Sequence, residues 1–328
     1  MVALAKIGLN GWWRGAEAGW HEYLVRATLK AIVHIPDGFL STPVWAVMDL
    51  TAAPAVGYAV RAAQRGFDDA KVPLLGVMGA FVFAAQMINF PVGIGTSGHL
   101  VGGALLAFTL GPAAAAVVMS AILAIQALVF QDGGILALGT NIFNMAIAGV
   151  LAGYLPYRLF GGGGGRRAAI FAGGALSVLT SALLALAELR FSGVRMPTAV
   201  LGVSLALFLV SALIEGAITL GVIRALEAIQ PDFVRQPAAG GRHAVIAAGV
   251  AAVLLASGGV VIASTAPDGI ERLAKQTGIE SRAHSLITAP LKDYQAGFLG
   301  AGWLAQACAG LIGLGLVGGV CWIAVRKR

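Results

Sequence analysis

The chain has 328 residues, of which 58% are hydrophobic and only 11% are charged, and its formal net charge is +7. A soluble globular domain carries about 25% charged residues, so this composition excludes that class and predicts an integral membrane protein. The basic residues are scattered along the chain rather than clustered, which argues against nucleic-acid binding.

The first 32 residues do not match the rest of the chain. They contain three tryptophans, four basic residues and two acidic residues, but no clean apolar run that would cross a membrane. No small-residue cleavage pattern follows an apolar core, so a secretory signal is not indicated. We expect residues 1–32 to be a mis-assigned start, with the natural chain beginning at Val33. The alternatives are an extension that a protease removes and one that is retained as an interfacial helix.

Nine apolar segments follow, and each is predicted to be a membrane helix. Crossing a hydrocarbon core takes roughly 20 helical residues, and lipid offers backbone groups no partners, so helices are expected where no alternating strand pattern occurs. The predicted fold is an all-α membrane bundle of seven helices followed by a two-helix hairpin. The spans are 39–60, 72–90, 99–111, 113–130, 138–159, 168–188, 198–223, 244–265 and 297–325. The third is short, which indicates a tilted, broken or buried helix.

Three regions follow from this organisation. Residues 33–225 form the seven-span domain, and residues 226–243, with their proline, glycine and charge, are expected to be a cytoplasmic linker. Residues 244–328, here called the tail module, form the two-helix hairpin with a hydrophilic outer loop over 266–296.

The distribution of Lys and Arg predicts the orientation in the membrane, because cytoplasmic loops carry an excess of basic residues. One set of loops holds twelve: Arg61, Arg65, Lys71, Arg158, Arg166, Arg167, Arg224, Arg235, Arg242, Arg326, Lys327 and Arg328. The short loops on the other side hold only Arg190 and Arg195. We therefore expect a multi-pass protein of the bacterial cytoplasmic (inner) membrane, with the side that has few basic residues facing outward.

Two of the five histidines stand at the ends of apolar segments. His34 lies in VHIPDGFL and His99, sixty-five residues further on, lies in GTSGHLVGG, and both fall on the predicted outer side. A chain with so few ionisable groups that places an imidazole at each junction is a candidate for binding a transition metal. The side chains flanking His99 are candidates to orient its ring or, alternatively, to cap helix ends. They are Gln86, Asn89, Thr96 and Ser97.

Three motifs carry a resemblance to a known family. They are HIPDGFL near the start, QMINFPVGIGTSGHLVGG at 86–103 and DGGILALGTNIFNMAIAG at 132–149. Together they resemble the substrate-binding membrane subunit of nickel and cobalt energy-coupling factor transporters, the CbiM/NikM family. The segment APDGIERLAKQTGIE at 266–280 is similar to the PDGLE-type loop of that family's small partner, CbiN/NikN. The resemblance implies a fusion of the two, which binds Ni(II) or Co(II) for uptake driven by separate ATPase subunits and a transmembrane coupling subunit.

The resemblance also implies a planar nitrogen site. A free amino terminus followed by histidine offers an amine, a deprotonated amide and an imidazole in fused chelate rings, and a second imidazole completes a square. Planar nitrogen coordination suits Ni(II) or Cu(II), whereas Zn(II) prefers a tetrahedron and Mg(II) prefers six oxygens. The matching positions are Val33 as the terminal amine, if it is the true start, together with His34 and His99. The ion would be the transported substrate, so no cofactor is expected.

Two other functions remain alternatives at this stage. Asp49 and Glu215 lie inside predicted spans, where ionisable groups are often functional, so a proton-linked secondary metal transporter is one of them. A membrane metalloenzyme is the other, although the sequence has no HExxH helix. No P-loop occurs either, so ATP hydrolysis is expected in partner subunits and the chain itself is not expected to be an enzyme.

Overall fold

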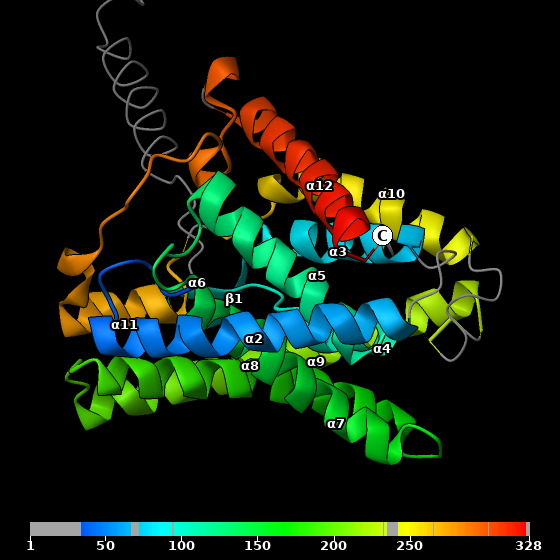
Figure 1. Ribbon diagram of the computed structural model, residues 1–328, viewed down its shortest axis with the longest axis horizontal. Helices are drawn as coiled ribbons and strands as arrows, with labels where there is room; N and C mark the ends of the chain where they lie inside the picture. The colour runs from blue at the N-terminus through cyan, green and yellow to red at the C-terminus, as the bar shows by residue number, and fades with distance from the viewer. Residues whose placement is uncertain are drawn as a thin grey trace, which may run out of the picture.

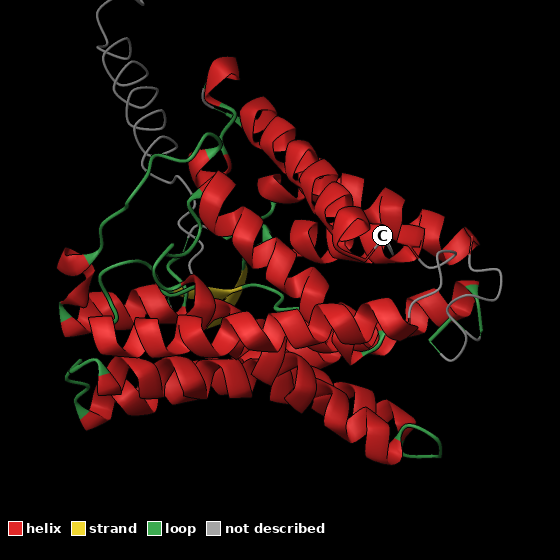
Figure 2. Ribbon diagram, in the orientation of Figure 1, coloured by secondary structure: helices red, strands yellow, loops and turns green. Residues whose placement is uncertain are grey.

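The computed structural model describes residues 34–66, 72–93, 95–231, 233–234, 242–264, 266–300 and 302–325. The expectations for residues 1–32 and for the Val33 amine therefore lie outside the described residues. The described chain is predominantly helical, with one small pair of strands (Figures 1 and 2). This confirms the prediction of a helical fold.

The helices and strands follow one another with short connections. The α-helices are α2 (Thr42–Gly66), α3 (Val72–Gln86), α4 (Gly103–Leu110), α5 (Pro112–Ile125), α6 (Leu138–Asn141), α7 (Val150–Phe160), α8 (Arg166–Phe191), α9 (Thr198–Ile229), α10 (Arg242–Gly258), α11 (Gly269–Thr277) and α12 (Trp303–Val325). Two π-helical segments, η2 (Gln126–Phe130) and η3 (Ile142–Gly149), extend α5 and join α6 to α7. Four short 3-10 turns lie in the tail module, at Gly259–Val261, Ile279–Arg282, Lys292–Tyr294 and Gly297–Leu299.

Five of the described helices are long and apolar enough to cross a membrane by length and composition. They are Pro112–Phe130, Leu138–Phe160, Arg166–Phe191, Thr198–Ile229 and Trp303–Ala324. Two shorter apolar helices, Pro73–Gln86 and Arg242–Gly258, accompany them. The membrane-helix character is thus supported, whereas the predicted number of nine spanning helices is not confirmed.

The third predicted segment, 99–111, contains a short buried helix, as its length indicated, but it is not a spanning helix. Residues 90–98 form an antiparallel pair of strands, β1 (Phe90–Gly93) and β2 (Thr96–Gly98), and His99 follows in a loop. Helix α4 begins only at Gly103 and has eight residues, which is about 12 Å of helix and too short to cross a bilayer. Gly102 and Gly111 at its two ends have φ of +78° and +83°, a left-handed conformation that ends a helix and favours glycine. The apolar sequence reflects burial inside the protein, because nearly all of α4 is buried.

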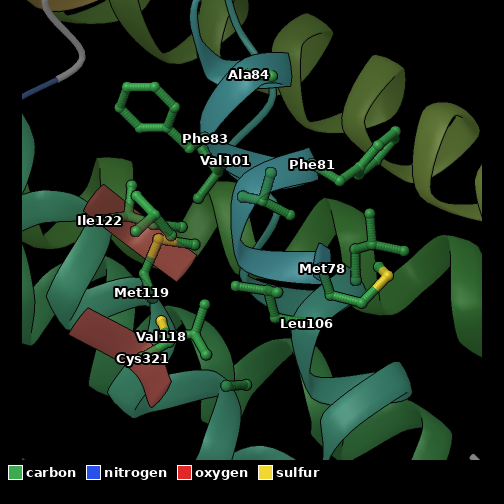
Figure 3. Close-up of a cluster of buried hydrophobic side chains, with 14 of the residues drawn as sticks. Met78, Phe81, Phe83, Ala84, Val101, Leu106, Val118, Met119, Ile122 and Cys321 are labelled. Atoms are coloured by element: carbon green, nitrogen blue, oxygen red, sulfur yellow. The ribbon is translucent and has the colours of Figure 1, made fainter. Parts of the chain in front are cut away.

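A buried apolar core joins the tail module to the rest of the bundle. Figure 3 shows Met78 and Phe83 of α3, Leu106 of α4, Met119 of α5 and Cys321 of α12 gathered in one cluster. Helices α10 and α12 both pack along α3, and α11 packs against α9 (Figure 1). The segment between α10 and α12 therefore meets loops of the first domain at one end of the bundle.

Candidate metal centre

His34 is held by a carboxylate from a distant loop. It opens the described chain just before α2, and its Nδ1 lies 3.0 Å from Oδ1 of Asp132, in the loop between η2 and α6. Burial raises the pKa of Asp132, but the nearby His34 and the hydrogen bonds from His34 and Tyr294 outweigh it and leave that pKa below its usual value. An ionised carboxylate only accepts, so Nδ1 of His34 carries the proton. Its Nε2 is buried without a hydrogen-bond partner among the described atoms, which leaves a lone pair for a metal.

The loop that follows His34 is fixed by backbone contacts. The Ile35 N–H donates to Oδ1 of Asn141 at 2.9 Å, and Nδ2 of Asn141 donates to the Ile35 carbonyl at 3.1 Å. Asp37 accepts from the backbone N–H groups of Ile135 and Leu136. The two loops approach closely at Gly133, where φ is +99° and an added Cβ would lie 2.9 Å from Cβ of His34. Glycine is therefore required where the Asp132 loop passes the histidine.

His99 is presented by the loop between β2 and α4. Its Nδ1 lies 2.7 Å from the carbonyl of Leu100, which can only accept, so Nδ1 carries the proton and Nε2 keeps its lone pair. Burial and the neighbouring His34 lower the pKa of His99 to about 4. The ring is consequently neutral at physiological pH, which is the form that ligates metals.

Glu215 holds the other end of the His99 loop. Its side chain reaches from α9 and accepts from the backbone N–H groups of Val101 and Gly102, each at 2.8 Å. Asp49 of α2 similarly accepts from the N–H of Gly139 at 2.8 Å. Both carboxylates thus have backbone hydrogen-bond partners.

The structure brings the two predicted imidazoles together. The ring centroids of His34 and His99 are 5.9 Å apart, with the ring planes inclined at 44°. A metal–nitrogen bond of about 2.0 Å places each ring centroid about 3.2 Å from the ion, so two rings on one ion lie within about 6.4 Å of each other. One ion can therefore contact both rings. Among the described residues, no group of three His, Cys, Asp or Glu side chains is gathered as a complete metal site.

Gln86 belongs to a buried chain of amides beside the site. Its Nε2 donates to the carbonyl of Val101 at 2.8 Å, and its Oε1 accepts from Nε2 of Gln126 at 2.9 Å. It supports the loop of His99 rather than the imidazole itself.

Asn89, Thr96 and Ser97 have hydrogen bonds to the tail module. The Asn89 carbonyl accepts from the N–H of Ser264, and Oγ1 of Thr96 accepts from Nη1 of Arg272 at 2.5 Å. Ser97 donates from its N–H to the Pro267 carbonyl and from Oγ to the Ala266 carbonyl. These contacts join the strand pair to the tail module.

The sequence alone did not identify Asp132, which contacts His34, or Tyr294, which contacts Asp132. Tyr294, from the tail module, donates its hydroxyl to Oδ2 of Asp132 at 2.6 Å. Asp132 opens the third motif, DGGILALGTNIFNMAIAG, so its place in that motif was an available signal. Tyr294 lies in an irregular loop with no local pattern around it, and only the folded chain reveals its contact.

Comparisons with known proteins match both parts of the chain. The family model described as the cobalt uptake substrate-specific transmembrane region matches residues 34–233, and the PDGLE domain model matches residues 242–327. The chain is 36% identical to a putative fused nickel transport protein, NikMN, of Archaeoglobus fulgidus, over 89% of this chain and 96% of that protein. It is 31% identical to the fused nickel transport protein NikMN of Rhodobacter capsulatus, over 87% of this chain and 95% of that protein. A crystal structure of a truncated transition metal transporter is 34% identical, with a TM-score of 0.52, and covers 60% of this chain and 99% of its own.

Proposed function

Because the chain belongs to the cobalt uptake substrate-specific transmembrane family and continues into a PDGLE domain, we propose that it binds Ni(II) or Co(II) as the substrate-specific subunit of an ATP-driven uptake system. The observation that carries the proposal is the pair of buried imidazoles, His34 and His99, whose ring centroids are 5.9 Å apart. Each ring donates a hydrogen bond from Nδ1 to an oxygen acceptor, so in the neutral form each has an Nε2 lone pair for a metal. The NikMN relatives, which are fused nickel transport proteins, match both parts of this chain.

The proposed ligands are nitrogens. The terminal amine of Val33, if the natural chain begins there, joins His34 and His99 in a planar set, which suits Ni(II) better than an oxygen-rich site would. Fused chelate rings through the His34 amide require Nδ1 of that ring, and in the structure Nδ1 faces Asp132. Chelation through Nδ1 would therefore require the His34 ring to turn about its Cβ–Cγ bond and to give up Asp132, whereas the orientation in the structure offers Nε2 to the metal.

The energy for uptake comes from other subunits in this proposal. The sequence contains no P-loop, so ATP hydrolysis belongs to partner ATPases, and a transmembrane coupling subunit transmits it. The proposed division is a metal-binding domain over 33–225, a linker over 226–243 and the tail module over 244–328.

The ends of the helices support an orientation with the metal site outside. Arg65 ends α2, Arg158 lies in the last turn of α7 and Arg166 begins α8, all at the end of the bundle opposite α11 (Figure 1). Basic residues favour the cytoplasmic side. We therefore place the histidines at the outer face of a bacterial cytoplasmic membrane.

Removing one imidazole tests the function. We expect His99→Ala and His34→Ala to weaken retention of Ni(II) and Co(II) by roughly 100-fold or more, because changes to groups behind a ligand already cost 10- to 100-fold. Equilibrium dialysis of the purified full chain measures this, with membrane accumulation and thermal unfolding as checks of folding. His243→Ala is the matched control, since His243 is exposed at the start of α10. Wild-type affinity in either of the first two variants would remove that residue from the site.

A further inference from the structure

A hydrogen-bonded chain connects the tail module to His34. Asp132 uses one carboxylate oxygen for His34 Nδ1, at 3.0 Å, and the other for the hydroxyl of Tyr294, at 2.6 Å. His34 is 1% exposed, Asp132 8% and Tyr294 6%, so water has little access to compete for these bonds. His34 and Tyr294, from distant parts of the sequence, thus both bind the carboxylate of Asp132.

A second chain leads from the same tyrosine to the loop of His99. Gln126 donates from Nε2 to the Tyr294 hydroxyl at 3.3 Å and to Oε1 of Gln86 at 2.9 Å. Gln86 in turn donates to the carbonyl of Val101, two residues after His99. The hydroxyl of Tyr294 is therefore linked to His34 through Asp132, and to the loop of His99 through Gln126 and Gln86.

The backbone at Tyr294 is strained, and its ring is firmly packed. Asp293 and Tyr294 have φ of +53° and +57°, which is uncommon for any residue except glycine and rare for a bulky one. Such conformations persist only where the surrounding structure imposes them, and they concentrate at functional sites. The ring of Tyr294 stacks on Phe130 at a centroid distance of 4.7 Å and lies 6.2 Å from Phe83. The packing fixes the position from which the hydroxyl reaches Asp132.

We propose that Tyr294 of the tail module is a positioning residue for the metal site, which fixes Asp132 and, through it, the ring of His34. A ligating imidazole needs an acceptor for the proton on its other nitrogen, and that acceptor orients the ring. In the orientation that the structure shows, Nδ1 of His34 faces Asp132, so Nε2 is the nitrogen left for the metal. The tail module thereby contributes to metal binding itself, and this inference rests on the proposed function.

Tyr294→Phe tests the inference with little disturbance, since the ring and its stacking on Phe130 remain and only the hydroxyl is lost. We expect the purified full chain to bind Ni(II) and Co(II) about tenfold more weakly, the loss typical of removing a group behind a metal ligand. The absorption spectrum of the bound Ni(II) should also change, which a purely structural role would not cause. Tyr154→Phe is the matched control, because Tyr154 is a half-buried tyrosine of α7, packed beside Tyr157.

A double-mutant cycle separates positioning from general stability. If Tyr294 acts through Asp132, Tyr294→Phe has no further effect on affinity in an Asp132→Ala background. An unchanged affinity in the single variant, or an equal loss in both backgrounds, would overturn the inference. Should Tyr294→Phe fail to accumulate, Gln126→Met removes the other partner of the hydroxyl; a loss of several-fold supports the inference and wild-type binding overturns it. Wild-type affinity in both histidine variants would overturn the proposed function as well, so the two fail separately.

Discussion

A buried carboxylate holds two backbone N–H groups in the loop of His99. Glu215, 1% exposed, accepts the N–H groups of Val101 and Gly102, each at 2.8 Å. The variant Glu215→Gln keeps the shape of the side chain but has only one acceptor oxygen, and its amide N–H₂ group faces the second backbone N–H. We expect one of the two hydrogen bonds to be lost and the His99 loop to shift.

The size of the effect follows from that lost bond. A hydrogen bond to a charged group contributes about 1.5 to 3 kcal/mol. If the metal must restore the loop on binding, the loss weakens Ni(II) binding by roughly 10- to 100-fold, since every 1.4 kcal/mol or so is a factor of ten. Equilibrium dialysis of the purified chain with Ni(II), together with its thermal unfolding without metal, measures both quantities.

A glutamate elsewhere on the same helix provides the control. Glu227, also on α9, pairs with Arg166 in a half-buried ion pair at the opposite end of the bundle. Glu227→Gln should leave Ni(II) binding at the wild-type level. If Glu215→Gln changed neither metal affinity nor thermal stability, the assignment of Glu215 as the support of the His99 loop would be wrong.

Three further predictions address other parts of the site. Asn141→Ala should lower the free energy of unfolding by about 1 to 3 kcal/mol and weaken Ni(II) retention, because it leaves the buried N–H of Ile35 without its acceptor. Chemical denaturation measures the first effect and equilibrium dialysis the second. Unchanged values in both measurements would contradict the prediction. Burial raises the pKa of Asp268, the N-cap of α11, to about 7. Between about pH 4 and pH 7 the folded chain therefore keeps a proton on Asp268 that the unfolded chain has released. The free energy of unfolding consequently falls as the pH rises through this range. Asp268→Asn should therefore gain most thermal stability over the wild type at pH 8 and least at pH 5, whereas parallel profiles would show that Asp268 does not titrate there. A chain trimmed to begin at residue 33 should gain about 2.7 kcal/mol of stability from Ni(II) at 100 times the dissociation constant of that trimmed chain. If a chain that keeps residues 1–32 gained as much at the same Ni(II) concentration, the amine would not be a ligand.

The sequence singled out the two imidazoles that the fold brings together, but not the groups that hold them. His34 and His99 were identified because polar residues are scarce in a membrane protein, so an imidazole beside an apolar segment stands out. Asp132 has no such contrast: it lies in a polar loop 98 residues from His34 and meets the ring only through the close approach of two loops. Tyr294 lies 162 residues from Asp132, and no periodicity connects them.

The helices likewise include one that the local sequence predicts and one that depends on tertiary contacts. The segment at 166–191 is a single uninterrupted apolar helix, as hydropathy predicts for 168–188. The segment at 99–111 is also apolar, but Gly102 at φ +78° ends the loop of His99 before α4 begins. Hydropathy reports burial and does not distinguish burial in lipid from burial among other helices, so only the tertiary structure resolves this case.

The position of the His34 ring is determined from both parts of the chain. The Asp132 loop reaches the histidine because glycine at 133 adopts φ +99° and leaves room for Cβ of His34. The carboxylate that this approach delivers has two oxygens, and the tail module occupies the one that His34 does not use. A chain without the tail module would keep the two imidazoles and the Asp132 loop, but would leave that second oxygen without its partner. Fusion of the two parts therefore has a direct consequence for the proposed metal site, beyond keeping them in the same membrane.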